Sequence, residues 1–233
     1  MSAAPEPVEF DLAGGDRRSL NRSLHEIEPD EGGARWRIRN PGGRHALCVG
    51  MAAEAELEIL GHVGYYCAGM NRSANIVIHG NAGPGVAENM MSGSVRVKGN
   101  ASQSAGASGR GGLLVIEGNA SARCGISMKG IDIVVAGSVG HMSAFMAQAG
   151  HLVVCGDAGA DLGDSIYEAV LYVRGTVASL GADCIEKEMA AAHVEELGGL
   201  LAAAGVEADA AAFRRYGSAR RLYNFDVDHA DEY

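Results

Sequence analysis

The chain has 233 residues, of which 47% are hydrophobic and 5% aromatic, and it contains 34 glycines. This length fits one domain with a modest extension at each end, and the glycine content favours a small, repeated structural unit. The formal net charge is −10 and no basic stripe stands out, which argues against a nucleic-acid partner.

The sequence indicates a chain that stays in the cytoplasm. The first residues, MSAAPEPVEF, lack the basic and apolar regions of a secretory signal. No apolar run approaches the roughly 20 residues that span a bilayer. An odd number of widely spaced cysteines predicts reduced, mostly buried thiols. These are Cys48, Cys67, Cys124, Cys155 and Cys184.

Residues 1–35 are predicted to form an N-terminal extension that caps the fold. A short helix is expected near Ser19–Ile27. The residues that follow, 36–49, are typical of strands and are expected to start the repeated part of the chain, which extends over 36–185.

Glycine recurs every 19 residues through this central region, without an insertion or deletion. Such a fixed period indicates a solenoid, because one short unit cannot bury its own apolar face. The glycines are expected to form corners where a Cβ would resist the required backbone conformation. They are Gly61, Gly80, Gly99, Gly118, Gly137, Gly156 and Gly175.

Apolar residues stand four and two positions before each repeat glycine, as in Leu57 and Ile59 before Gly61. This period of two predicts strands with one buried face. Small residues two and seven positions after each glycine suit tight corners. Left-handed β-helices are built in sixes, and 19 is not a multiple of six. The predicted fold is therefore an all-β, right-handed parallel β-helix of about seven 19-residue coils, on the order of 30 Å long.

Residues 186–205 are predicted to form an amphipathic helix, since apolar residues recur there at helical spacing. The later coils carry apolar residues three positions before the glycine, where side chains face outward. These are Val115, Val134, Val153 and Tyr172. We expect the C-terminal helix or a partner to cover them. Residues 206–233 are expected to be a polar tail that orders only against a partner.

Two sets of polar residues are candidates for a catalytic or metal-binding site. His141, His151, Cys155 and Asp164 are chemically suited to a metal, but their coil positions point in different directions. Asp157, Asp161 and Asp164 could supply an acid–base pair as in β-helix lyases. Those enzymes build their sites from irregular loops, and these coils carry no insertion. The sequence therefore predicts no catalytic, cofactor-binding or metal-binding residue in this chain.

Methionines and two cations gather on one side of the predicted rod. One interpretation is that the methionines fill the interior beside the small-residue columns. The other is an apolar docking strip for a partner subunit, with the cations as polar anchors. The candidate interface residues are Met90, Met91, Arg110, Met128, Lys129, Phe145 and Met146.

The repeat resembles the GXGXG-repeat family. The units Gly61-His-Val-Gly64, Gly80-Asn-Ala-Gly83 and Gly156-Asp-Ala-Gly159 carry the likeness, which covers about residues 36–185. That family includes the C-terminal domain of the glutamate synthase large subunit and the β-helix subunit of formylmethanofuran dehydrogenase. Segments such as Cys124-Gly-Ile-Ser-Met-Lys-Gly130 and Gly140-His-Met-Ser-Ala-Phe-Met146 resemble most the branch of the N-methylglutamate synthase β-helix subunit and the GlxC-type glutamate synthase-like subunits.

The resemblance implies a non-catalytic scaffold in a multi-subunit enzyme. In that family a class II glutamine amidotransferase part and an FMN-dependent, iron–sulfur-containing synthase part perform the chemistry. Both would be partner subunits here, and this chain would bind no cofactor. Two alternatives stay open: the β-helix subunit of a formylmethanofuran dehydrogenase or formyltransferase complex, and a stand-alone β-helix enzyme acting on polysaccharide through Asp161 or Asp164.

Overall fold

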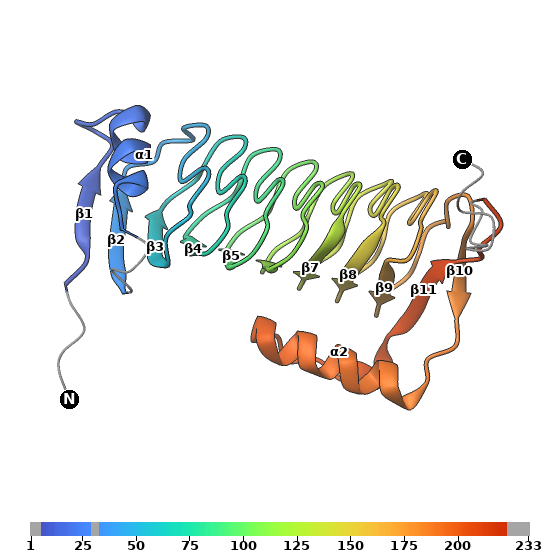
Figure 1. Cartoon of the computed structure of the whole chain (residues 1–233). Helices are drawn as coiled ribbons and strands as arrows, with labels where there is room; N and C mark the ends of the chain where they lie inside the picture. The colour runs from blue at the N-terminus through green and yellow to red at the C-terminus, as the bar shows by residue number, and fades with distance from the viewer. Residues whose placement is uncertain (1–5, 29–32, 223–233) are drawn as a thin grey trace, which may run out of the picture.

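A computed structural model describes residues 6–28 and 33–222 and shows a rod of stacked coils, a parallel β-helix (Figure 1). This confirms the predicted fold class. A helix lies near each end of the element order. The elements are β1 Val8–Asp11, α1 Arg17–His25, β2 Ala34–Arg39, β3 Ala55–Leu60, β4 Asn75–Ile78, β5 Ser94–Val97, β6 Leu113–Ile116, β7 Lys129–Val135, β8 Ala149–Val154, β9 Val170–Val173, β10 Cys184–Lys187, α2 Ala191–Ala204, the 3₁₀ turn η1 Ala210–Ala212 and β11 Arg214–Ser218.

One sheet of eleven strands runs the length of the rod in the order β1 to β9, then β11 and β10. From β3 to β9 each strand pairs in parallel with the next, and partners lie one repeat apart, as in Leu57 with Ile76. A second line of parallel bridges joins Val63 to Ala82, Ala82 to Ala101, and onward to Val177. The 19-residue repeat of the sequence is thus the register of the stack.

The core fills the inside of the coils. Leu114 and Ile116 in β6, and their equivalents in every coil from β3 to β9, are at most 1% exposed. Stacking places each apolar residue on its equivalent in the coils before and after it, which excludes water along the whole rod. The predicted inward-facing columns are confirmed.

The repeat glycines are required for a different reason from the one expected. Within this column only Gly61 has a left-handed φ, of +143°. A Cβ on Gly80 would lie 2.7 Å from the carbonyl carbon of Gly61, and the later column glycines are as crowded. The Gly99 N–H also donates to the Gly80 carbonyl over 3.1 Å. Close approach of successive coils, and not a special dihedral angle, selects glycine at six of the seven positions.

A ladder of side chains follows the glycine column. The Asn100 N–H donates to Asn81 Oδ1, and the Asn119 N–H donates to Asn100 Oδ1, each over 2.8 Å. The Ser138 N–H continues the ladder onto Asn119. These bonds satisfy corner amides that the sheet leaves unpaired. These bonds explain why asparagine follows the repeat glycine in the Gly-Asn-Ala units.

Helix α2 lies along the outer face of the later strands (Figure 1). Leu197 and Leu201 pack in one buried cluster with the outward-facing residues Val134, Val153 and Tyr172. Of the two covers expected for this face, the C-terminal helix or a partner, the structure shows the helix. The helix begins at Ala191 and not near 186, because Cys184–Lys187 pair as a strand.

Arg96 and Gly205 define the C-terminal end of α2. Arg96 Nη2 donates to the Ala204 carbonyl over 2.6 Å, which places a cation at the helix C-terminus. Gly205 follows with a left-handed φ of +61°, the usual helix C-terminal conformation. The helix is therefore anchored to β5 as well as to the later coils.

The prediction of a tail that orders only against a partner is wrong for residues 206–222. Strand β11 lies antiparallel between β9 and β10, and Phe213 and Tyr216 are 2–3% exposed. Ser218 Oγ donates to the Asp183 carboxylate and the Arg221 N–H donates to it as well. The segment closes the last coil by supplying a strand. Residues 223–233 lie outside the described part of the chain.

The N-terminal elements close the other end of the rod. Helix α1 begins at Arg17 with Asp16 as its N-cap, close to the predicted range, and buries Leu20 and Leu24. Asn21 completes the first coil: its Nδ2 donates to the Ala46 carbonyl over 2.8 Å and its Oδ1 accepts from the Cys48 N–H over 2.9 Å. Strand β1, which was not predicted, pairs in parallel with β2.

A histidine links three strands to α2. His151 Nδ1 lies 2.7 Å from Asp132 Oδ1, and its Nε2 lies 3.4 Å from Glu196 Oε1 on the helix. Tyr172 donates its hydroxyl hydrogen to the same Glu196 carboxylate. The hydrogen bond to Asp132 raises the pKa of His151, burial opposes the shift, and Glu196 adds to it. Protonated His151 thus bridges two carboxylates.

The stability contributed by His151 is expected to depend on pH. Because its pKa is raised in the folded state, the contribution is complete below the ordinary value of 6.5 and is lost as pH rises through the raised value. We expect His151→Gln to cost about 1 kcal/mol of unfolding free energy at about pH 6, and clearly less at about pH 9. Urea unfolding of both proteins at each pH measures this. An equal cost at both values would contradict the bridging role.

Candidate interaction surface

The position eleven residues after each repeat glycine forms an exposed column along one edge of the rod. Successive coils are joined there by backbone bonds of 2.7–2.8 Å, such as Arg110 N–H to the Met90 carbonyl and Lys129 N–H to the Gly109 carbonyl. This stacking confirms that Arg110 and Lys129 are neighbours in adjacent coils. The column consists of Arg72, Met91, Arg110, Lys129, Gln148 and Tyr167.

Two of the predicted interface residues are not on this surface. Met90 and Met128 are completely buried, because the position before the exposed column points into the coil. For these two, docking a partner is the wrong interpretation and filling the interior is the right one. Met91 and Met146 are 39% and 44% exposed.

The exposed surface extends beyond the candidate interface residues. Met70, 40% exposed, stands on the same edge as Met146, two positions before the exposed column. A small hollow of about 230 Å³ is lined by Met146, Gln148, Ser165 and Tyr167. We call the whole surface the methionine–cation strip: Met70, Arg72, Met91, Arg110, Lys129, Phe145, Met146 and Tyr167.

Arg72 was missed in the sequence, although it occupies the same repeat position as Arg110 and could have been found by extending that column one coil further. Within residues 6–28 and 33–222, no carboxylate forms an ion pair with Arg72, Arg110 or Lys129. Thioethers and unpaired cations on a rigid edge suit contact with a protein surface that is apolar and acidic. The use of this strip as an interface stays a prediction.

The three aspartates considered as an acid–base pair are engaged by neighbouring donors. Asp157 Oδ1 accepts from the N–H and hydroxyl of Thr176, and the Thr176 N–H lowers the Asp157 pKa. Asp161 accepts from Ser179 Oγ at 3.3 Å, and Asp164 accepts from the Ser165 hydroxyl at 2.7 Å. A general acid needs a raised pKa, so Asp157 is unsuited to that role.

The four residues considered as metal ligands lie in different surroundings. His151 faces α2, and Cys155 is buried beneath the same helix. His141 is exposed at a corner, and Asp164 is half-buried and accepts from the Ser165 hydroxyl. In the described ranges no group of three or more His, Cys, Asp or Glu side chains is placed to hold a metal ion. The five cysteines are free and buried, as predicted. Burial raises the pKa of the Cys67 and Cys124 thiols to about 12, so they remain neutral in the core.

Fold and surface together define a parallel β-helix protein with an exposed strip of methionines and cations along one edge. No protein-family model matches the chain, and membership of the GXGXG-repeat family stays a prediction. The chain is 61% identical over 225 residues to Protein GlxC of Rhizobium meliloti (strain 1021), covering 96% of this chain and 99% of that protein. The chain therefore belongs to the GlxC family. None of the described helices is long and apolar enough to cross a membrane.

Proposed function

We propose that this chain is a non-catalytic scaffold subunit of a glutamate synthase-type complex, in the branch of N-methylglutamate synthase. Its partners would be a class II glutamine amidotransferase subunit and an FMN-dependent synthase subunit. FMN and the iron–sulfur cluster would be bound by the synthase. The complex would act in methylamine and glutamate metabolism.

The observation that carries the scaffold role is the methionine–cation strip on a rigid rod. The strip offers unpaired cations and exposed thioethers along successive coils, whereas the aspartates considered for catalysis are held by neighbouring donors. A rod built from regular coils holds such residues at fixed spacings of about 4.8 Å. The choice of the glutamate synthase type is supported by the resemblance of the Gly-Asn-Ala repeat units.

The proposal is tested by recovering the tagged chain from its own host under native conditions, with mass spectrometry and a visible absorbance spectrum. We expect an amidotransferase and a yellow flavoprotein to be recovered with it. Molybdopterin- or tungsten-containing partners would instead support the formylmethanofuran dehydrogenase type. A lone, colourless chain that cleaves polysaccharide would overturn the scaffold role.

The strip gives a sharper prediction. We expect Met91→Glu/Met146→Glu to leave the unfolding free energy within about 0.5 kcal/mol, because both side chains are well exposed. The same change is expected to weaken partner binding at least about tenfold, because it places two carboxylates in an apolar contact. Co-purification yield and thermal unfolding measure the two effects. The control is Ala160→Glu, which places a carboxylate at an exposed position on another corner. If the wild-type chain, the double methionine variant and Ala160→Glu recovered partners equally, the strip would not be part of the interface.

A further inference from the structure

A second, differently charged surface lies at the N-terminal end of the rod. A hollow of about 570 Å³ separates the start of α1 from the loop at residues 42–45, and an adjoining hollow of about 740 Å³ continues along the helix. Both are lined by Arg17 and Arg18, so they form one groove. The groove also receives Arg22 from α1 and Arg44 from the loop. We call it the arginine groove.

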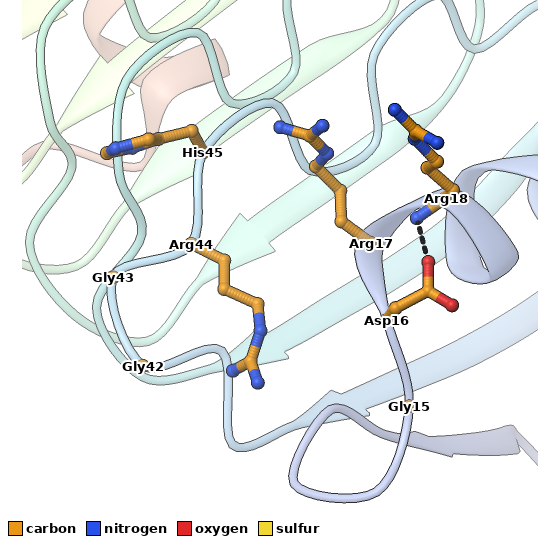
Figure 2. Close-up of a pocket in the computed structure, with 8 residues that line it drawn as sticks. All are labelled: Gly15, Asp16, Arg17, Arg18, Gly42, Gly43, Arg44 and His45. Carbon is orange, nitrogen blue, oxygen red and sulfur yellow. Dashed lines mark hydrogen bonds between the residues drawn. The ribbon is translucent and has the colours of Figure 1, made fainter.

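The arginine groove is basic in a chain of net charge −10, since its four arginines outnumber the two carboxylates that also line it, Asp16 and Glu26. Figure 2 shows Arg17 and Arg18 extending to the same side from the first turn of α1, with Arg44 across from them. Arg44 Nη1 donates to the carbonyls of Asn40 and Pro41, over 3.1 and 3.3 Å. In the part of the chain that the structure describes, none of the four arginines has a carboxylate within ion-pair distance.

The arrangement works against the stability of α1. The N-terminus of a helix carries a partial positive charge, which acidic residues stabilise and basic residues destabilise. The first turn of α1 holds two arginines and no acidic residue. Only the N-cap Asp16 offsets them, and its carboxylate is occupied by Arg18 N–H, Ser19 N–H and Ser19 Oγ. Local features that oppose stability are expected where residues serve binding.

The shape of the groove selects an extended ligand. Small-molecule sites are enclosed and bury most of their ligand, whereas this groove is open along one side of α1. The nine residues of α1 span about 13 Å, which corresponds to about four residues of extended chain. The arginines occur at 17, 18 and 22, so they are spread along this length.

We propose that the arginine groove binds an extended acidic segment of a partner protein. Glutamate or aspartate side chains would receive bidentate hydrogen bonds from Arg17, Arg18 and Arg22, and Arg44 would close the opposite wall. The groove and the methionine–cation strip involve separate residues, so this inference does not depend on the type of enzyme complex.

The test uses the full chain and a fluorescein-labelled hexaglutamate peptide, with fluorescence anisotropy at low salt. We expect saturable binding that weakens as salt is added, and at least about tenfold weaker binding for Arg17→Glu/Arg18→Glu. That variant should unfold at no lower temperature, because acidic residues at positions 17 and 18 are favoured in the first turn of α1. Loss of binding could then not be assigned to loss of structure.

The matched control is Arg72→Glu/Arg110→Glu, which makes the same change in net charge on the strip. It should leave hexaglutamate binding unchanged. Equal weakening by both variants would mean that net charge alone drives binding and would overturn the proposal. Absence of saturable binding would overturn it too, as would binding of pyrophosphate or a six-nucleotide single-stranded DNA that is as tight as that of the peptide.

Discussion

Gly118→Ala is expected to destabilise the protein by about 3 kcal/mol, although it adds a single methyl group. Gly118 stacks directly on Gly99, and a Cβ there would lie 2.8 Å from the Gly99 carbonyl oxygen and against Asn100 Oδ1. Movement of the Asn100 side chain would leave the Asn119 N–H without its acceptor. Separation of the coils would lengthen the Gly118 N–H bond to the Gly99 carbonyl, now 3.0 Å.

The control for this prediction is the same substitution in helix α2. Gly199 is exposed and has open space where a Cβ would be. Gly199→Ala is therefore expected to stabilise the protein by up to about 1 kcal/mol, because alanine favours the helix and restricts the unfolded chain. Urea unfolding monitored by circular dichroism measures both variants. Similar small effects of the two would contradict the account of the glycine column.

Leu197→Ala is expected to cost about 3 kcal/mol, the second largest effect. Leu197 is completely buried between α2 and the outer face of the sheet, where it packs in one cluster with Val134, Val153 and Tyr172. Truncation leaves a cavity at the centre of this contact. We expect α2 to detach more readily, which would raise proteolysis of the α2 segment and the binding of a hydrophobic dye.

Leu222→Ala provides the matched comparison, because it removes the same atoms from a side chain that is 51% exposed. Its expected effect on the unfolding free energy is within about 0.5 kcal/mol. If Leu197→Ala were as mild, and neither proteolysis nor dye binding changed, α2 would not be the element that protects the apolar face of the later coils.

The sequence was sufficient to predict the fold because each coil repeats without insertion. Equivalent residues such as Leu57, Ile76 and Val95 are 19 residues apart, and the structure pairs them across neighbouring strands. The repeat period therefore predicts the register of the sheet. The outward-facing Val134 and Val153 also had to be covered, and the helical pattern near Leu197 indicated one element that could cover them. Both inferences follow from the need to bury apolar surface.

Other features depend on three-dimensional proximity that no period reveals. The reason for Gly80 is the carbonyl of Gly61 one coil before it, a contact made only after stacking. The sequence of strand β11 has the composition of a polar tail and was interpreted as one. The strand is stabilised largely by its pairing with β9 and β10, which its own composition does not indicate. Propensity is a weak guide to strands of that kind.

The candidate surface was predicted in part. Met90 and Met91 are adjacent in the sequence but point to opposite sides of the coil wall, and composition alone did not separate them. The arginine groove was not found in the sequence, because Arg17 and Arg18 line the same hollow as Arg44 only when α1 packs against the loop before β3. Surfaces assembled from different elements require the folded structure.

The most direct test of the scaffold role is reconstitution from separately purified chains, once the partners have been recovered. The amidotransferase and the flavoprotein would be analysed by size-exclusion chromatography with and without this chain, alongside a turnover assay of each chain alone. We expect one joint peak only when this chain is present, and no turnover by this chain alone. A joint peak formed in its absence, or turnover by the isolated chain, would contradict the scaffold role.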